Sequence, residues 1–168
     1  MKNFYTFKRG SVILVDFSPQ IGSEIKGKHF AIVLTKKDRK NNELLTVIPL
    51  TSKYHKYHID FGNEISDSIY NELYSTISKI EQACNSWTGT ADSAEFKDID
   101  KKILMCKDII KRYKQLKEHT YGKPNQITTI SKFRIVKPIN EIDPIRKLKV
   151  SNVVMDKIDK AIIDLFTK

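Results

Sequence analysis

The sequence has few cysteines and no long hydrophobic run, and each shortage excludes a class of protein. Its 168 residues include only two cysteines, Cys84 and Cys106, which are too few for a disulfide framework or a structural zinc site. No apolar stretch approaches the roughly 18 residues of a membrane-spanning helix. The segment MKNFYTFKRG lacks the apolar run of a signal peptide. We therefore expect a cytoplasmic protein with no membrane contact; no metal site and no cofactor are expected either.

Acidic side chains are also in deficit, and the deficit is uneven. The chain has 30 Lys and Arg against 20 Asp and Glu. Residues 64–120 hold 9 basic and 10 acidic side chains, whereas the other 111 residues hold 21 and 10. The positive excess on those other residues suits a polyanionic partner such as nucleic acid. The alternative is a solvated lysine-rich surface without such a partner.

The most informative stretch that is present runs from Arg9 to Leu34. Two apolar runs, RGSVILVDF and HFAIVLT, are typical of strands, and the first alternates as a strand covered on both faces does. Pro19, Gly22 and Gly27 interrupt the segment between them and predict a loop. Loops that join core strands commonly carry functional groups. This loop and its end carry four ionisable side chains: Glu24, Lys26, Lys28 and His29.

Three later blocks follow in order: TVIPLTS at Thr46 to Ser52, GKPNQITTISKFRI at Gly122 to Ile135, and SNVVMDKIDKAIIDLF near the C-terminal end. Together with RGSVILVDFSP and GSEIKGKHFAIVL, they make about 100 of the 168 residues resemble the MazF/PemK family of toxin endoribonucleases. The resemblance implies a compact SH3-like β-barrel, usually a homodimer. It also implies metal-independent cleavage of single-stranded RNA, leaving a 2′,3′-cyclic phosphate, and neutralisation by a small antitoxin protein.

The segment between Phe61 and Tyr121 departs from the resemblance and predicts two amphipathic helices joined by a short turn. Asp92 and Glu95 predict a capping box for the second helix. We expect an antiparallel hairpin, 64–119, whose two cysteines are core residues. Its role stays open between a dimer surface, an antitoxin-binding surface, a gate over the RNA and simple bulk. The two apolar stripes are Ile65, Ile69, Leu73, Ile77, Ile80, Cys84 and Trp87, then Phe96, Ile99, Ile103, Cys106, Ile110 and Tyr113.

The expected fold is therefore an α+β protein with a single domain over residues 1–168. Residues 8–62 and 121–139 are expected to form the SH3-like barrel of MazF/CcdB type, with the helical hairpin inserted between them. A C-terminal helix is expected at 151–167, with Ser151 as its N-cap. The apolar stripe of this helix would pack on the barrel; its members are Val154, Ile158, Ile162 and Leu165.

The resemblance also assigns candidate catalytic positions. It places the family's arginine at His29 and its phosphate-contacting threonine at Thr51, beside Ser52. A basic residue and an aspartate of the PemK-type branch fall at Lys123 and Asn125. Metal-free cleavage by the 2′-OH needs a base, an acid and donors to the phosphorane.

Histidine titrates near neutral pH, whereas arginine stays charged. We therefore predict His29 as general acid or base, with Thr51 and Ser52 holding phosphate oxygens. Glu24 would be a second base or orient a cation, and Lys26, Lys28 or Lys123 would supply the positive charge of the missing arginine. The alternative is that His29 is a strand-end histidine bonded to a neighbour and that activity is lost or shifted.

The segment TSKYHKYHIDF interleaves basic and aromatic side chains. Its His55 and His58 lack a third ligand nearby in sequence, which argues against a metal site. As an alternating strand, it would place Tyr54 with Lys56 on one face and His55 with Tyr57 on the other. Such a ribbon could stack unpaired bases, or it could be a solvated loop. The predicted RNA-binding residues are Lys26, Lys28, Lys53, Tyr54, His55, Lys123, Asn125 and Gln126.

Two other functions remain compatible with the sequence. The same barrel also occurs in toxins that bind a protein target such as gyrase and cut nothing. A nucleic-acid-binding regulator that kept a basic groove without the chemistry is the other alternative. Cleavage of RNA without magnesium separates the enzyme from both.

Overall fold

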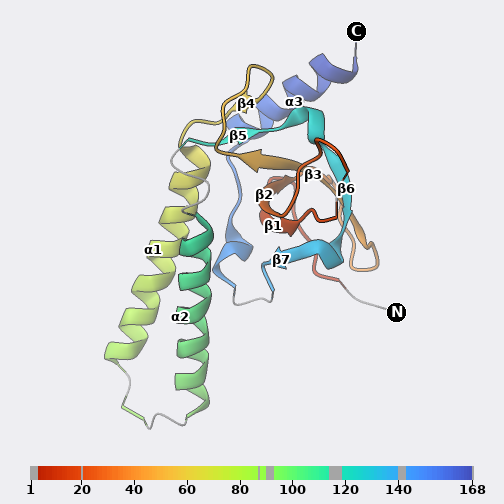
Figure 1. The fold of residues 1–168 in the computed structure, drawn as a ribbon. Coiled ribbons are helices and arrows are strands. Elements are labelled where there is room, and N and C mark those ends of the chain that lie inside the picture. The colour runs from red at the N-terminus through yellow and green to blue at the C-terminus, as the bar shows by residue number, and fades with distance from the viewer. Residues whose placement is uncertain are drawn as a thin grey trace.

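The computed structural model describes residues 4–19, 21–86, 88–89, 93–113, 119–139 and 143–167. Figure 1 shows a curled sheet, a long helical hairpin projecting from one side of it, and a C-terminal helix across one end. The strands are β1 (Val12–Asp16), β2 (Lys28–Val33), β3 (Leu44–Thr51), β4 (Ile59–Asp60), β5 (Tyr121–Gly122), β6 (Thr128–Ser131) and β7 (Ile135–Lys137). The helices are α1 (Glu64–Asn85), α2 (Ala94–Tyr113) and α3 (Asn152–Phe166), with 3₁₀ turns η1 (Pro124–Gln126), η2 (Lys132–Arg134) and η3 (Pro144–Lys147).

The sheet is antiparallel and bends back on itself. Its order is β4-β5-β3-β2-β1-β7, and β6 pairs with β3 as well. β6 pairs with β3, and β7 pairs with β1. Because only the turn η2 separates β6 from β7, this short segment connects two strands that are not neighbours in the sheet. The result is the predicted α+β fold with a barrel-like sheet.

Strand β1 has a hydrophobic environment on both faces, as its sequence predicts. Val12 and Leu14 belong to a core shared with the three α-helices, whereas Ile13 and Val15 belong to a second core inside the curled sheet. All four are at most 2% exposed. The alternating side chains of β1 therefore contribute to two cores, one on each face of the sheet.

The hairpin packs on the sheet only near its base. Ile65 and Ile69 of α1 and Ile109 of α2 are at most 1% exposed and join the core of the sheet. Farther out, the structure corrects two predictions: Cys84 is exposed, and Phe96 is 37% exposed. The reason is that the outer part of the hairpin extends beyond the sheet (Figure 1), so that its stripe has only the other helix to pack on.

The remaining predictions for the hairpin have mixed outcomes. Cys106 is buried, as expected. Trp87 and Asp92 lie outside the described residues, and the described cap of α2 is Ser93, whose Oγ accepts from the N–H of Phe96 at 3.2 Å.

The two ends of the hairpin meet at the strand pair β4–β5. Asp60 is paired with Tyr121, and the N–H of Phe61 donates to the carbonyl of Thr120 at 3.1 Å. Gly122 lies so close to the ring of Phe61 that an added Cβ would come within 2.7 Å of it. This close approach needs glycine. It lets β5, which continues toward the candidate site, pack directly against the start of the hairpin.

Helix α3 begins as predicted, since the Oγ of Ser151 accepts from the N–H of Val154 at 3.3 Å. Val154 and Ile158 are fully buried, but Leu165 is 45% exposed, contrary to the predicted stripe. The last turns extend past the sheet (Figure 1), which explains the exposure. Within the described residues, no helix combines the length and apolarity needed to cross a membrane.

Candidate functional site

The loop between β1 and β2 is folded back by its glycine and serine. Gly27 has φ of 79°, a conformation that other residues rarely adopt. Its carbonyl accepts from the N–H of Phe17 at 2.9 Å, and its N–H donates to the Oγ of Ser18 at 3.1 Å. These bonds close the loop beside the rim, and His29 follows at the start of β2, opposite Val15.

His29 is held by backbone carbonyls. Its Nε2 lies 2.8 Å from the carbonyl oxygen of Lys26, and because a carbonyl can only accept, this nitrogen carries the proton. Burial lowers the pKa of His29 below its usual value; hydrogen bonds to the carbonyls of Lys26 and Leu50 oppose the shift, and the charge of Lys123 adds to it. His29 therefore has the neighbour-bonded arrangement that the sequence left open as an alternative.

Beside His29 the structure forms an open groove of about 410 Å³. The end of β3, the loop that follows it and the connection from β5 to β6 supply its walls. No acidic side chain occurs among its lining residues, so its charge comes from lysine and histidine. Those residues, which we call the groove, are Thr51, Lys53, Tyr54, His55, His58, Lys123, Asn125 and Gln126. All except His58 are predicted site residues that the fold brings together.

The loop of residues 52–58 is not the alternating strand that was one reading of its sequence. The N–H of His58 donates to the carbonyl of His55 at 2.9 Å, closing a turn. The turn brings the rings of His55 and His58 to 5.2 Å between centroids, while Tyr54 packs edge-on against Tyr121 at 5.9 Å. Because a turn does not alternate faces, Tyr54 and His55 line the same groove.

His58 differs from His29 in how it is held. Its Nδ1 lies 3.0 Å from the carbonyl oxygen of Lys53, so Nδ1 carries the proton. Burial lowers the pKa of His58; the bond to Lys53 opposes this, and the charges of Lys123 and His55 add to it. The neutral ring that results has Nε2 as its basic nitrogen, and the ring itself lines the groove.

The charge of Lys123 contributes to the lowered pKa of both His29 and His58. Its backbone N–H donates to the carbonyl of Pro49 at 3.0 Å, which attaches it to β3. Burial lowers the pKa of its ammonium group, and the charge of Lys53 lowers it further. Next to it, the Oγ1 of Thr51 accepts from the N–H of Lys53 at 3.1 Å. The groove thus contains a hydroxyl, a lysine with a lowered pKa and a neutral histidine.

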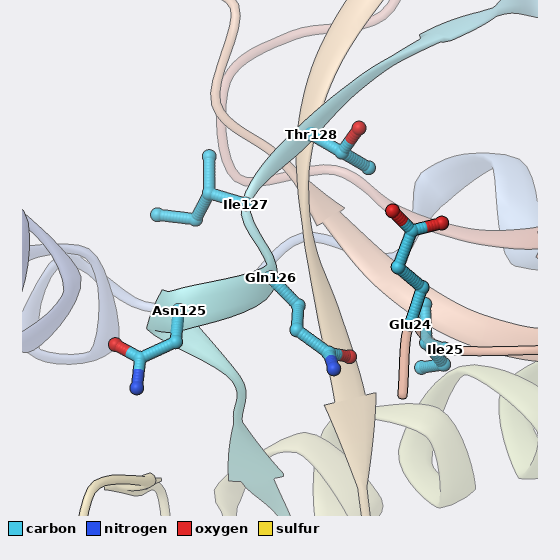
Figure 2. A pocket seen from close by; sticks show the side chains of 6 residues that line it. All are labelled: Glu24, Ile25, Asn125, Gln126, Ile127 and Thr128. Atoms are coloured by element: carbon cyan, nitrogen blue, oxygen red, sulfur yellow. The ribbon is translucent and has the colours of Figure 1, made fainter. Parts of the chain in front are cut away.

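Besides His29, four predicted residues lie outside the lining of the groove. Ser52 and Lys26 are not among its lining residues, although the carbonyl of Lys26 holds His29. Lys28 lies opposite Asp16 in the register of β1 and β2. The pKa of the Asp16 carboxyl is lowered mainly by the hydrogen bond from the N–H of Ser18, and the charge of Lys28 is a smaller cause. Glu24 lines a second, smaller hollow, which Figure 2 shows from close by.

Sequence reasoning missed three rings around the groove. His58 was considered only together with His55 as a metal pair, which the sequence argued against, although the spacing of the two histidines was the signal that could have linked them. His119 lies 2.7 Å from Oδ1 of Asp60 through Nε2, and its ring packs on Tyr121 at 4.8 Å between centroids. Nothing in the sequence linked His119 to Asp60, which is 59 residues away. Among the described residues no three His, Cys, Asp or Glu side chains come together to hold a metal ion.

Comparison with known proteins identifies a family and a fold. A family model described as the PemK-like, MazF-like toxin of type II toxin–antitoxin systems matches residues 8–106. The crystal structure of MazF (Form-I) from Deinococcus radiodurans matches with a TM-score of 0.52 and 12% identity, over 98% of this chain and 100% of that one. At this identity the second match shows the fold alone. A search of the curated proteins found no match.

Proposed function

This chain belongs to the family of PemK-like, MazF-like toxins of type II toxin–antitoxin systems, and from that premise we propose that it is an endoribonuclease acting on single-stranded RNA. We also propose that it is a homodimer and that a cognate antitoxin neutralises it. The observation that carries the nuclease proposal is the groove. Thr51, which the resemblance places at the phosphate, and Lys123, which it places at a basic residue of the PemK-type branch, line the same groove as a histidine with a lowered pKa.

The groove has the parts that cleavage by the neighbouring 2′-OH requires. The 2′-oxygen attacks phosphorus as the bond from phosphorus to the 5′-oxygen breaks, giving a 2′,3′-cyclic phosphate and a free 5′-OH. Nε2 of His58 takes the proton of the 2′-OH, because a lowered pKa keeps it unprotonated at neutral pH. The ammonium group of Lys123 gives a proton to the leaving 5′-oxygen, and its lowered pKa suits that role.

The phosphorane gains negative charge, and the groove supplies donors to it. We assign the hydroxyl of Thr51 and the ammonium group of Lys53 to its oxygens. The hydroxyl of Ser52, the residue after Thr51, is proposed as a further donor to the phosphorane oxygens. His29 serves as a positioning residue, because its Nε2–H holds the carbonyl of Lys26 and so fixes the loop beside Lys123. The rings of Tyr54 and His55 are placed to stack on unpaired bases.

The test is incubation of the purified protein with a mixed RNA pool in the presence of EDTA. We expect discrete fragments that end in 2′,3′-cyclic phosphate, and a loss of about 10²- to 10⁴-fold for His58→Ala, as for removal of a general base. Undiminished cleavage by both the Thr51→Ala and the His58→Ala protein would contradict the proposal. Retarded but uncut RNA would favour the regulator, and supercoiling defects with intact RNA would favour a gyrase-binding toxin.

The two histidines need separate variants because their surroundings differ. His29→Ala removes the bond to Lys26 and is expected to weaken substrate binding more than the chemical step, so KM rises more than kcat falls. His58→Ala is expected to lower kcat. The reverse pattern would return the acid–base role to His29, as the sequence first predicted.

A further inference from the structure

The second hollow lies directly beside the groove and has a different chemistry. Its volume is about 190 Å³, and we call it the Glu24 hollow (Figure 2). It shares Asn125 and Gln126 with the groove. A nucleotide whose phosphate lies in the groove therefore has its base, or that of its neighbour, within reach of this hollow. The lining residues are Glu24, Ile25, Asn125, Gln126, Ile127 and Thr128.

We infer that the Glu24 hollow reads one base of the RNA and that this base is guanine. The inference rests on the proposed function, because it takes single-stranded RNA as the ligand of the groove. The size of the hollow suits it: a protein cavity of about 150 Å³ holds benzene, so about 190 Å³ admits one planar base but not a folded chain. Ile25 and Ile127 supply apolar contacts for the faces of the ring, as pockets for small ligands commonly do.

One polar atom in the wall of the hollow, on Gln126, lacks a partner among the described residues. Nε2 of Gln126 donates to the carbonyl of Ser23 at 3.0 Å and so anchors the loop before Glu24 to η1. Its Oε1, however, is buried and accepts no hydrogen bond from the described residues. Buried acceptors in native proteins nearly always have a donor, so this oxygen is an independent sign that a donor-bearing ligand completes the site.

Glu24 selects among the four bases by the number of donors that it can accept. The N–H of Ile21 donates to its Oε2 at a long 3.3 Å, and Figure 2 shows the carboxylate directed toward the side of Thr128. An ionised carboxylate offers two adjacent acceptors and no donor. Guanine presents two adjacent donors, N1–H and the N2 amino group, on its Watson–Crick edge. Adenine and cytosine present one donor there beside an acceptor, and uracil presents one donor between two acceptors, so each would place a lone pair against an oxygen of Glu24.

The placement of the two sites also explains their opposite charges. A carboxylate in the groove would repel the phosphate, and none lines it. In the Glu24 hollow the negative charge of the carboxylate repels a phosphate and so favours an uncharged base. Glu24 is therefore a specificity-determining residue rather than the second base that the sequence allowed.

Binding of uncleavable RNA tests the inference apart from catalysis. The probes are fully 2′-O-methylated nonamers of uridine whose central residue is guanosine, inosine, adenosine, cytidine or uridine, measured by fluorescence anisotropy. We expect guanine to bind about 10- to 100-fold more tightly than uridine, the range of one bidentate base contact. Inosine lacks the 2-amino group and is expected to lose about tenfold relative to guanine.

The sharpest variant is Glu24→Gln, because glutamine offers one acceptor and one donor. We expect the guanine preference to be lost, because glutamine can pair with the adjacent donor and acceptor that adenine, cytosine and uracil each present. Glu43→Gln is the matched control: it removes the same charge from a carboxylate at the other end of β3, bonded to Ser131, and is expected to keep the guanine preference. Equal binding of all nonamers by the wild-type protein, or a guanine preference that survives Glu24→Gln, would overturn the inference.

Mapping the cut ends of unmodified RNA separates this inference from the proposed function. Cleavage with no guanine near the cut would leave the nuclease intact and overturn the guanine site. Guanine-selective binding of the methylated nonamers without cleavage of unmodified RNA would support the base site and contradict the nuclease.

Discussion

The groove and the helical hairpin differ in charge, burial and the work that their side chains do. The groove has two lysines, two histidines and no carboxylate among its lining residues. The hairpin segment of residues 64–120 is nearly neutral, with 9 basic and 10 acidic side chains. Groove side chains are mostly half-buried or exposed, and both His58 and Lys123 have lowered pKa values. The base of the hairpin instead buries Ile65, Ile69 and Ile109 almost completely.

The difference teaches that chemistry and stability are placed in separate regions of one small protein. Clustering like charges and burying them in part costs stability, which functional sites commonly tolerate. The apolar base of the hairpin adds buried area to the core of the sheet and offsets that cost. The strand pair β4–β5 joins the two regions. Substitutions on either side of it should therefore separate activity from stability.

The largest effect is expected for Lys123→Met. Removing the acid and its charge from the groove should lower kcat by about 10²- to 10⁴-fold, with little change in the melting temperature. The measurement is single-turnover cleavage of a defined RNA, with circular dichroism as the check on folding.

Lys123→Arg is the control that separates the two roles of the lysine. Arginine keeps the positive charge but does not give up a proton under ordinary conditions. If Lys123 is the general acid, arginine should restore binding and not kcat. Full activity of Lys123→Arg would reduce its role to charge alone.

The next effect is on stability and lies in the hairpin. Ile69→Ala removes a fully buried side chain from the shared core and should lower the free energy of unfolding by about 2–5 kcal/mol. Cleavage well below the melting temperature should stay close to that of the wild-type protein. Leu104→Ala, at a residue of α2 that is 59% exposed, is the matched control and should cost no more than about 0.5 kcal/mol. Similar losses in the two variants would show that the hairpin does not stabilise the sheet through its base.

A smaller effect is expected in the pH dependence of kcat/KM. The base works unprotonated, so the rate rises with pH through the pKa of His58 and then levels off. Because burial lowers that pKa below its usual value of 6.5, the midpoint of the acidic limb should lie at a pH below 6.5. The acid works protonated, and since the pKa of Lys123 is lowered from 10.5, the alkaline limb should fall below pH 10.5. An acidic limb above pH 6.5 would contradict His58 as the base.

The sequence predicted the parts of this comparison that depend on local pattern. The alternation in RGSVILVDF and the three-to-four spacing around Ile69 identify a strand and a helix without knowledge of their partners. The same spacing could not show that Cys84 is exposed, because a helical stripe gives the apolar face and not the point where the packing partner ends. The exposure of Leu165 in α3 has the same cause.

The sequence predicted most of the residues that line the groove, but not that Glu24 lies apart from them. Seven of the eight groove residues were candidates from the sequence, owing mainly to the resemblance. The separation of Glu24 from them depends on Gln126, whose side chain bonds to Ser23 across 103 residues of sequence. The turn at His55 likewise replaces alternation with a cluster of rings. Contacts of this range are a property of the assembled fold, which local patterns do not specify.

The smallest effect compares one lysine from each region. Lys53→Met removes a charge from the groove, and Lys101→Met removes one from an exposed position on α2. Each phosphate contact on a single strand contributes about 0.7 to the slope of log affinity against log salt concentration. Lys53→Met should therefore reduce that slope by about 0.7, whereas Lys101→Met should leave it unchanged. Titrations of a 2′-O-methylated RNA at several salt concentrations measure both. Because the two variants change the net charge of the protein equally, a difference in slope locates the RNA on the groove. Equal slopes would mean that the whole basic surface, rather than the groove, attracts the RNA.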